Sequence, residues 1–437
     1  MKTKSIFLFA ALMGLCGCQS TYDGVVVKDP ITVTFPVPTK TIESVSLTPQ
    51  QKEYVKGSSQ MAFRLLEKLN TGETFLCSPL SLQCALSMTA NGASGETLRE
   101  MLDVLGFGED GMDALNAYNK SLLDQLPAVD KDVTLKLTDA LLVNDMFPLQ
   151  EAFQKTVQDN YYAAVENDNF ADPATTAARV NEWADRNTEG FIKEVLTPSD
   201  IIPNTAALLM NALYFKAKWA GSEMDPMFRE EFTKDENFTL ESGVKITVPM
   251  MRHGGSYFRY AQRDGYLVVA VPYANWKYYM YIILPEEGSS LASVAASLAS
   301  TPWEEITSGM SRDAEVYLKI PRFEAENRYK LKGTLKALGM EKAFLDNGDA
   351  QFDRMFEAEK NVWFWIEEVI QKNRISVAEW GTEAASVTVV EMGWATSPGP
   401  GEEEPKRIYC YCDHPFFFVI GEATSGTILF EGAYTGK

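Results

Sequence analysis

The chain has 437 residues, of which 46% are hydrophobic, so it is long enough to bury the core of one large domain or two ordinary ones. It carries 60 acidic against 40 basic residues, a formal net charge of −20, and no local basic cluster offsets this charge. Such a surface repels nucleic acid and anionic lipid, so we expect neither nucleic-acid binding nor a heparin-like partner.

The first twenty residues, MKTKSIFLFAALMGLCGCQS, have the layout of a secretory signal. Two lysines precede an apolar run that is too short to cross a bilayer stably. The run ends in Leu15-Cys16-Gly17-Cys18, which resembles a bacterial lipobox, in which the cysteine is acylated and becomes the first residue. We therefore expect a signal peptide at 1–17 and lipidation of Cys18. The alternative is an ordinary signal with two incidental cysteines.

Residues 18–49 are rich in Thr, Val and Pro (TVTFPVPTKT) and lack helical periodicity, which predicts an extended tether. After it, VKGSSQMAFRLLEKL presents a serine cap followed by apolar residues at helical spacing. CSPLSLQCALSMTANG predicts a second helix that Asn-Gly ends. The first third of the chain is expected to be mainly helical.

From about Thr205 the sequence changes to apolar, β-branched and aromatic runs, which predict strands: ALLMNALYFKAKW, YLVVAVPY, YYMYIILP and AEVYLKIPRF. One helix, YKLKGTLKALGMEKAF, interrupts them before a further pair of strands in VWFWIEEVIQKNRISVAEW. Helices first and strands afterwards, without regular alternation, favour an α+β domain over a doubly wound sheet.

Metal binding and catalysis find little support in the sequence. Four cysteines lie beyond the signal region, too few for a disulfide framework: Cys77, Cys84, Cys410 and Cys412. We interpret them as small buried thiols, because a zinc site on the last two would need two more ligands and the chain has only His253 and His414. No G-x-S-x-G motif occurs, and neither histidine has a triad context. We therefore predict a protein that is not an enzyme and binds no metal or cofactor.

The most informative segment is 381–407, GTEAASVTVVEMGWATSPGPGEEEPKR, because loops of this length without secondary structure are usually functional or disordered. Its first part has good strand propensity, whereas SPGPGEEEP is acidic and rich in breakers. At period two, one face of the first part carries only small or β-branched side chains: Thr382, Ala384, Ser386, Thr388 and Val390. Such a peptide could stay an exposed loop or become a central strand, which makes it a switch candidate. Composition alone favours the alternative, a flexible Ala/Thr linker.

The segment EWGTEAASVTVV resembles the hinge of the reactive-centre loop of serpins. Five further segments resemble motifs of this family, in the family's order: CSPLSLQCALSMTANGASGETLREM, NEWADRNTEGFIKEVL, LLMNALYFKAKW, YKLKGTLKALGMEKAF and DHPFFFVI. The chain is thereby identified as a member of the serpin family. The resemblance implies a serpin domain at 50–437, with an α+β fold of three mostly antiparallel β-sheets, about nine helices and an exposed reactive-centre loop at about 381–407.

The resemblance also implies the function, which is inhibition of serine proteases by suicide-substrate trapping. In this family the native state is metastable and the loop starts outside a five-stranded central sheet. After a protease forms its acyl-enzyme, the cut loop inserts as an extra strand and carries the enzyme to the opposite pole. Insertion of the fourteen residues from Thr382 to Ala395, at about 3.3 Å per residue, would move the protease by roughly 46 Å. The alternative is a non-inhibitory serpin-fold binding protein on the cell surface; the small side chains of Ala384 and Ser386 favour the inhibitor.

Matched residue by residue, the resemblance assigns three groups of functional residues. The hinge comprises Glu379, Gly381, Thr382, Glu383, Ala384, Ala385 and Ser386. The shutter beneath the opening strands comprises Ser78, Pro79, Ser81, Asn211 and Gln371. Trp219 marks the breach, where insertion begins. Gln371 stands where the family usually has a histidine, so it can form hydrogen bonds but cannot become charged.

The bait residue implied by the family's count is Ala395, with the scissile bond to Thr396, which suits elastase-like or subtilisin-like proteases. Because SPGPGEEEPK lengthens the loop after this bond, Trp394 is an alternative bait for chymotrypsin-like enzymes. Papain-like cysteine proteases are candidate secondary targets. Trp380 replaces a charged residue of the family's hinge, and Val387 a smaller one.

The signal and the resemblance together predict where the protein acts. We expect an exported lipoprotein that is held by its lipid at the outer membrane and faces the periplasm or the cell surface. We also expect it to be a monomer.

Overall fold

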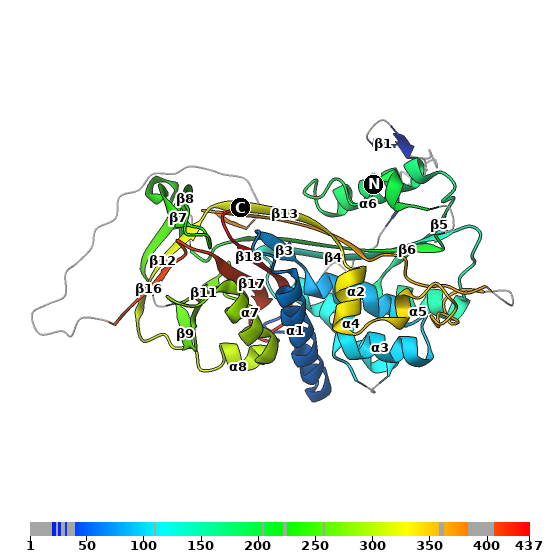
Figure 1. Cartoon of the computed structure of the whole chain (residues 1–437), viewed down its shortest axis with the longest axis horizontal. Helices are drawn as coiled ribbons and strands as arrows, with labels where there is room; N and C mark the ends of the chain where they lie inside the picture. Colours follow the sequence, from blue (N-terminus) through cyan, green and yellow to red (C-terminus); the bar gives the residue numbers. More distant parts are fainter. Residues whose placement is uncertain are drawn as a thin grey trace, which may run out of the picture.

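The computed structural model describes residues 20–22, 25–27, 31–32, 40–108, 111–202, 205–221, 225–256, 258–357, 362–382 and 406–437. Within these ranges, nine α-helices surround three large β-sheets, which confirms the predicted α+β serpin architecture. Figure 1 shows an elongated molecule in which one long sheet has α6 on one face and α1 to α5 on the other. None of the helices in these ranges is long and apolar enough to cross a membrane.

The helices lie mainly in the first half of the described chain. The α-helices are α1 (Pro49–Leu69), α2 (Pro79–Ala90), α3 (Gly95–Leu105), α4 (Met112–Gln125), α5 (Glu151–Tyr161), α6 (Pro173–Asn187), α7 (Leu291–Ser300), α8 (Trp303–Thr307) and α9 (Lys332–Leu338). Short 3-10 turns are η1 (Leu126–Ala128), η2 (Pro198–Asp200), η3 (Glu230–Phe232) and η4 (Lys342–Phe344). The prediction of a single helix among the later strands was wrong, because α7 and α8 also follow there.

The start of α1 corrects a second prediction. The helix begins at Pro49, and the side chain of Thr48 accepts a hydrogen bond from the backbone N–H of Gln51 in a capping box. The serine cap expected within VKGSSQ was therefore wrong, because Thr48 and the proline after it supply cap and first turn earlier in the chain. The start of α2 agrees with the sequence, since Ser78 caps it and Pro79 occupies its first position.

The central sheet has the strand order β13-β14-β15-β6-β4-β5. Its strands are β13 (Phe323–Lys330), β14 (Ile370–Ala378), β15 (Gly381–Thr382), β6 (Ala207–Lys218), β4 (Val133–Asn144) and β5 (Ala164–Asp168). All neighbouring pairs are antiparallel except β4 with β5. Among the described residues, only the two-residue strand β15 joins β14 to β6. This junction positions the candidate site.

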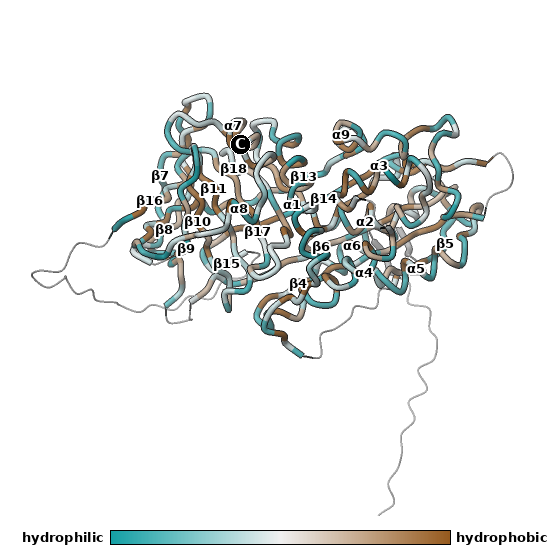
Figure 2. Tube along the Cα trace, turned by 90° about the horizontal axis from the view of Figure 1, so that it is seen from below, coloured by the Kyte–Doolittle hydropathy of each residue, from teal (hydrophilic) through white to brown (hydrophobic). Residues whose placement is uncertain are grey.

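Two further sheets complete the fold. The second has the order β3 (Phe75–Cys77), β18 (Ile428–Tyr434), β17 (Phe416–Glu422), β11 (Tyr278–Pro285), β10 (Tyr266–Pro272) and β9 (Arg259–Arg263). The third has the order β16 (Arg407–Tyr411), β12 (Glu315–Pro321), β8 (Lys245–Ser256) and β7 (Lys234–Thr239). Figure 2 shows hydrophobic stretches along inner strands such as β10 and β17, which are buried on both faces.

A smaller core lies under α6, on the outer face of the central sheet. Trp183 and Val180 of α6 pack there against Leu142 of β4 and Met210 of β6. Ile31, from the segment predicted as a tether, is buried in the same cluster. Its neighbours in sequence, Ser20–Tyr22 (β1) and Val25–Val27 (β2), form an antiparallel pair. Part of this segment therefore packs on the domain.

Candidate functional site at the hinge, breach and shutter

The hinge residues Gly381 and Thr382 already lie in the central sheet as β15. Thr382 pairs with Ala217 of β6 and with Val377 of β14, antiparallel to both. Its hydroxyl shares a 2.6 Å hydrogen bond with the hydroxyl of Tyr273. The expectation of a five-stranded sheet with the loop wholly outside it was therefore wrong at this end, because Thr382 is small enough to lie between the two strands and finds a polar partner there.

Gly381 lies where a side chain would collide with the neighbouring strand. Its φ of +148° is in the region that favours glycine. A Cβ at this position would lie 2.1 Å from the carbonyl oxygen of Ala217 and 2.7 Å from the Cα of Lys218. The sheet therefore requires glycine here, while its role as the pivot of the loop stays a prediction.

Trp219, the predicted breach residue, holds the turn that leads from β14 into β15. Its indole N–H donates to the carbonyl of Ala378 over 2.8 Å, and its backbone N–H donates to the carbonyl of Trp380 over 3.2 Å. The indole ring stacks on Tyr273, with centroids 4.5 Å apart and planes inclined by 7°. Trp219 and Tyr273 together therefore fix the point at which the loop enters the sheet.

Glu379, the first hinge residue, is buried in this turn. Its carboxylate accepts a 2.6 Å hydrogen bond from the hydroxyl of Thr233 and pairs with the guanidinium of Arg322 over 3.5 Å. These two partners and Tyr273 were not identified from the sequence, since they come from segments between or just after strands that are distant in the sequence. The contacts hold the base of the hinge against the third sheet.

The residues assigned to the shutter lie together at the start of α2. Gln371 of β14 accepts a hydrogen bond from the backbone N–H of Ser78 over 3.2 Å and donates to the carbonyl of the same residue over 2.8 Å. The Asn373 amide adds a 2.9 Å bond to the Gln371 oxygen. The glutamine therefore bonds to both backbone groups of Ser78 without any charge, beside the 3.1 Å bond that the C=O accepts from the N–H of Leu82.

The other side of the shutter reaches β6 and β4. The Ser81 hydroxyl donates to the side-chain oxygen of Asn211, and the amide of Asn211 donates to Asp139 over 2.7 Å. Pro79 occupies the first helical position between the two serines, where a missing N–H costs nothing. The first turn of α2 is thus bonded to strands on both sides of the β6–β14 junction.

Asp139 is a buried carboxyl that the sequence analysis missed. Its Oδ2 atom has no hydrogen-bond partner among the described residues. Burial raises the pKa of Asp139 to about 7, although the hydrogen bond from Asn211 acts in the opposite direction. The only signal in the sequence is one carboxylate inside the apolar run TLKLTDALLV.

The segment 188–200, which follows α6 and is called the crossing segment below, crosses the outer face of the sheet over the β6–β14 junction. Glu189 pairs with Lys136 of β4 over 2.7 Å, and the carbonyl of Phe191 accepts a bond from Arg374 of β14 over 3.3 Å. A cavity of about 10 Å³, room for about one water molecule, lies beneath it between β6 and β14, next to Thr382. The crossing segment therefore lies over the path that an inserting strand would take.

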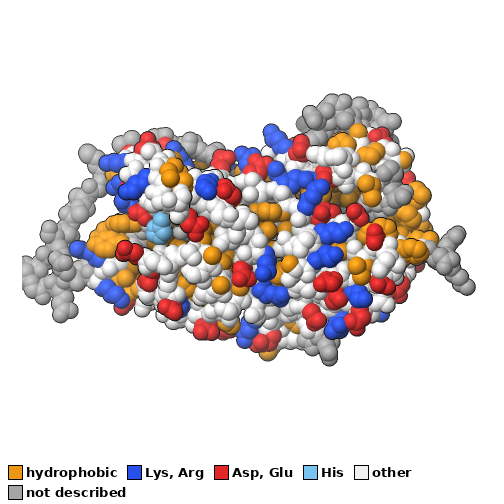
Figure 3. Space-filling view, in the orientation of Figure 1, with side chains coloured by type: hydrophobic (Ala, Val, Ile, Leu, Met, Phe, Trp, Pro, Cys, Tyr) orange, Lys and Arg blue, Asp and Glu red, His pale blue; other side chains and the backbone are white. Residues whose placement is uncertain are grey.

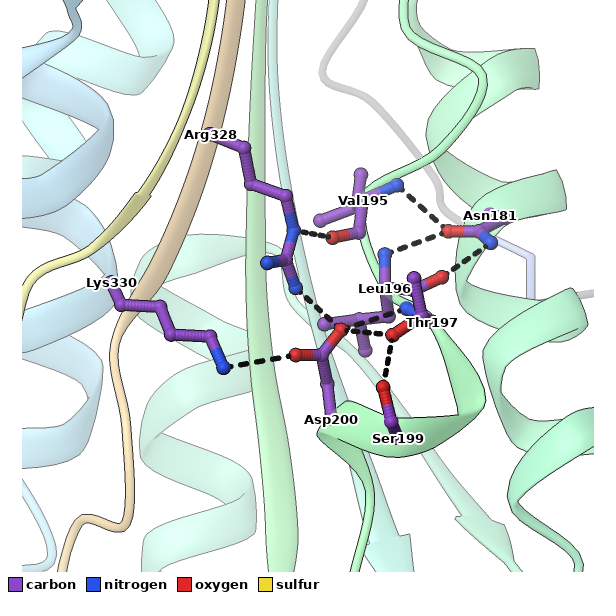
Figure 4. A network of polar contacts seen from close by, with 8 residues as sticks. All are labelled: Asn181, Val195, Leu196, Thr197, Ser199, Asp200, Arg328 and Lys330. Atoms are coloured by element: carbon purple, nitrogen blue, oxygen red, sulfur yellow. Dashed lines mark hydrogen bonds and ion pairs between the residues drawn. The ribbon is translucent and has the colours of Figure 1, made fainter.

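Figure 4 shows how the end of this segment is fastened to β13. Asp200 pairs with Arg328 over 2.5 Å and with Lys330 over 3.3 Å, and Arg328 also donates to the carbonyl of Val195 over 2.8 Å. The side chain of Asn181 on α6 accepts bonds from the backbone of the same segment. Burial opposes ionisation of Asp200, but the hydrogen bonds from Arg328 and Thr197 outweigh it and lower the pKa well below its usual range.

Comparisons with known proteins agree on one family. A family model described as Serpin (serine protease inhibitor) matches residues 56–436. The chain belongs to the serpin family. A serpin-like protein of Thermococcus kodakarensis, described as uncharacterized, is 34% identical over 386 residues, 88% of this chain and 85% of its own. Serine protease inhibitor 42Dd of Drosophila melanogaster is 31% identical over 383 residues, 86% and 94% of the two chains.

Solved structures agree with the sequence comparisons. The crystal structure of tengpin, a thermophilic serpin, in its native state is similar to this serpin with a TM-score of 0.79 and 25% identity. The match covers 92% of this chain and 98% of tengpin. Serpins in general are protease inhibitors rather than catalysts.

Several predicted residues of this serpin lie outside the described residues and stay predictions: Cys18, Glu383, Ala384, Ala385, Ser386, Trp394, Ala395 and Thr396. Cys77, Cys84, Cys410 and Cys412 are buried free thiols. In the part of the chain that the structure describes, no group of three or more His, Cys, Asp or Glu residues is arranged to hold a metal ion.

Proposed function

We propose that this serpin inhibits serine proteases by trapping them covalently after its reactive-centre loop has been cut. The observation that carries the proposal is β15, because the first two loop residues already pair with both β6 and β14. Hydrogen bonding along the rest of these two strands would extend the same ladder. The small side chains predicted to face inward favour this continuation over a static loop.

The chemistry of trapping is an acyl transfer that ends at the acyl-enzyme ester. The serine hydroxyl of the protease attacks the carbonyl carbon of Ala395, the bond to Thr396 breaks, and the new amine leaves with a proton. The protease is then joined to Ala395 as an ester. Insertion from Thr382 onward competes with attack of water on this ester, so the outcome depends on the two rates.

Target and location are further parts of this proposal. Ala395 suits elastase-like and subtilisin-like proteases, and Trp394 would serve a chymotrypsin-like enzyme. Acylation of Cys18 would anchor the inhibitor at the outer membrane. The observed packing of Ile31 on α6 supports a short connection between such an anchor and the domain.

The test uses residues 18–437 with Cys18→Ser, mixed with an elastase. Trapping predicts a band near the summed mass that survives boiling in detergent, and a released peptide that begins at Thr396. Thr382→Arg is the control, because a long charged side chain between β6 and β14 would stop insertion and turn the inhibitor into a substrate. Cleavage without a stable band for elastase, subtilisin and chymotrypsin alike would favour the alternative, a non-inhibitory binding protein on the cell surface.

A further inference from the structure

Three tyrosines form a continuous aromatic surface on the third sheet. Successive side chains of a strand point to opposite faces of its sheet. The buried Leu318 of β12 and Cys410 of β16 face the core, so Tyr317, Tyr409 and Tyr411 face outward. We call these three side chains the tyrosine platform. Figure 3, which counts tyrosine as hydrophobic, shows such side chains gathered at the left-hand end of the molecule, where Figure 1 places β12 and β16.

The rings of the tyrosine platform follow one another at equal distances. Tyr317 and Tyr409 are directly paired in the parallel register of β12 and β16, and their ring centroids lie 5.5 Å apart with the planes inclined by 34°. The centroids of Tyr409 and Tyr411 are also 5.5 Å apart, with an inclination of 58°. Tyr409, the middle ring, is 54% exposed. The platform therefore offers a path of three neighbouring rings rather than a single exposed side chain.

The strand beside β12 leaves room next to the platform. β8 carries Gly254 and Gly255 at this point. A Cβ at Gly254 would lie 3.6 Å from the Cε1 atom of Tyr317, and one at Gly255 would lie 3.6 Å from the hydroxyl oxygen of the same tyrosine. Gly255 also has a φ of +67°, which favours glycine. Because both residues are glycines, neither places a side chain against the ring of Tyr317.

Charged side chains at one end of the platform are paired with one another. The ammonium group of Lys319 lies 2.8 Å from the carboxylate of Glu236 and 4.5 Å from the centre of the Tyr411 ring. The guanidinium of Arg252 donates to the same carboxylate over 2.8 Å. One carboxylate thus lies between two cations, and all three groups are only partly buried. This end of the platform offers hydrogen-bond donors and acceptors with little excess charge.

The other end has a similar pair. The carboxylate of Glu315 accepts a 3.2 Å hydrogen bond from the hydroxyl of Tyr317 and lies 3.9 Å from the guanidinium of Arg407. The hydrogen bond orients the Tyr317 ring before any ligand arrives, and preorganised side chains lose little freedom on binding. A ligand that is rich in hydroxyl groups can donate to such carboxylates and accept from such cations.

We propose that the tyrosine platform is a binding site for a neutral oligosaccharide chain. The flat face of a pyranose ring carries C–H groups, which stack on the negative face of an aromatic ring. The hydroxyl groups at the edge of each sugar would bond to Glu315, Arg252 and Lys319. A chain of linked sugar rings repeats at a spacing close to that of the three tyrosine rings, so neighbouring sugars would stack on neighbouring tyrosines.

Charge and shape favour a neutral sugar chain over other ligands. The formal net charge of −20 repels anionic glycans, nucleic acid and anionic lipid. The paired charges around the platform leave no large excess of either sign that would attract an ionic partner. Small apolar ligands bind in concave pockets, whereas the platform is an open face of a sheet. An extended neutral chain that stacks and forms hydrogen bonds fits these features together.

This inference goes beyond the proposed function and does not depend on it. The platform consists of described residues of β12 and β16, and sugar binding there requires neither cleavage nor insertion of the loop. Its consequence would be to hold the intact serpin on a polysaccharide surface. Binding can therefore be measured in the absence of any protease, and a failure of covalent trapping would leave the result unchanged.

The experiment is a calorimetric titration of residues 18–437 with Cys18→Ser, the parent chain. The probes are four neutral hexasaccharides: cellohexaose, maltohexaose, laminarihexaose and mannohexaose. We expect saturable binding of at least one of them at millimolar concentration. Tyr409→Ala, which removes the middle ring, should weaken this binding at least tenfold. Tyr409→Phe keeps the ring and should bind within twofold of the parent, because stacking does not need the hydroxyl group.

Trp365→Ala is the matched control, since Trp365 is an aromatic side chain that is 37% exposed but precedes β14 of the central sheet. Its sugar binding should equal that of the parent. The proposal would be overturned if none of the four probes bound to the parent, or if Tyr409→Ala bound as tightly as the parent. An equal loss in Trp365→Ala would also overturn it. So would a change in oligomeric state or in the rate of reaction with elastase for Tyr409→Ala with sugar binding unchanged, because the platform would then serve a protein partner.

Discussion

Asp139 makes stability at the shutter depend on pH. A carboxyl group in an unfolded chain titrates near pH 4, whereas burial raises the pKa of Asp139 to about 7. The folded state therefore keeps its proton through a range in which the unfolded state has lost it. The free energy of unfolding should fall as pH rises from about 4 to about 7, by about 4 kcal/mol for a shift of about 3 units.

Asp139→Asn removes this titration while keeping the size of the side chain and a partner for Asn211. Relative to its value at low pH, the free energy of unfolding of the parent is lower by about 1.5 kcal/mol at pH 5 and by about 4 kcal/mol at pH 8, by the same linkage. The advantage of the variant should therefore grow by about 2 to 3 kcal/mol between these two pH values. Asp113→Asn, which changes an exposed carboxylate in the first turn of α4, is the control and should show no such growth.

The assay is urea unfolding followed by tryptophan fluorescence at pH 5, 6, 7 and 8, with unfolding rates recorded beside the midpoints because the proposed metastable state would be protected by a barrier. A gain for Asp139→Asn that stays constant across these pH values would refute the reasoning. It would mean that the carboxyl keeps one charge state throughout, and that the partnerless Oδ2 atom is stabilised in a way that the fold does not reveal.

Three further changes test the hinge, the shutter and the crossing segment. Thr382→Arg should turn the inhibitor into a substrate, with the number of inhibitor molecules consumed per protease rising at least tenfold in a titration of protease activity. Gln371→Leu leaves the backbone N–H of Ser78 without its partner and removes one of the two hydrogen bonds to its C=O, which should lower the free energy of unfolding by about 1 to 3 kcal/mol in urea titrations. Arg328→Met should destabilise the protein at neutral pH, and this loss should shrink below about pH 4, because the lowered pKa of Asp200 stabilises the fold above its unfolded pKa and not once the group is protonated.

The fold was largely predictable because strands and helices carry local signals. The runs assigned to β6, β10, β11 and β12 are apolar, β-branched and bounded by breakers, and each became a strand. The run VWFWIEEVI has the same composition, but the strand predicted there does not form before Ile370. Strand propensity measures fit to a pleated surface and says nothing of whether a neighbouring strand is present. The inward residue of this run, Phe364, packs on two loops instead.

The site was predictable only as far as family motifs reached. Ser78, Ser81 and Gln371 were assigned from motifs and do meet at the start of α2. The partners of two other assigned residues were missed because they are remote in sequence. Tyr273 lies 109 residues from Thr382, and Asp139 lies 72 residues from Asn211. No local pattern records such pairs, since only the sheet register brings them together.

The same register explains why the short strand β15 is important for the central sheet. Within the described residues, β14 and β6 meet only through Gly381 and Thr382, and a strand with a free edge favours pairing with any suitable segment. For the proposed insertion, the segment fastened by Asp200 to β13 lies across the path of the loop and would act as a barrier. Weakening the fastening should therefore speed the proposed insertion in addition to lowering stability, as predicted for Arg328→Met, and the insertion rate is a readout separate from the free energy of unfolding.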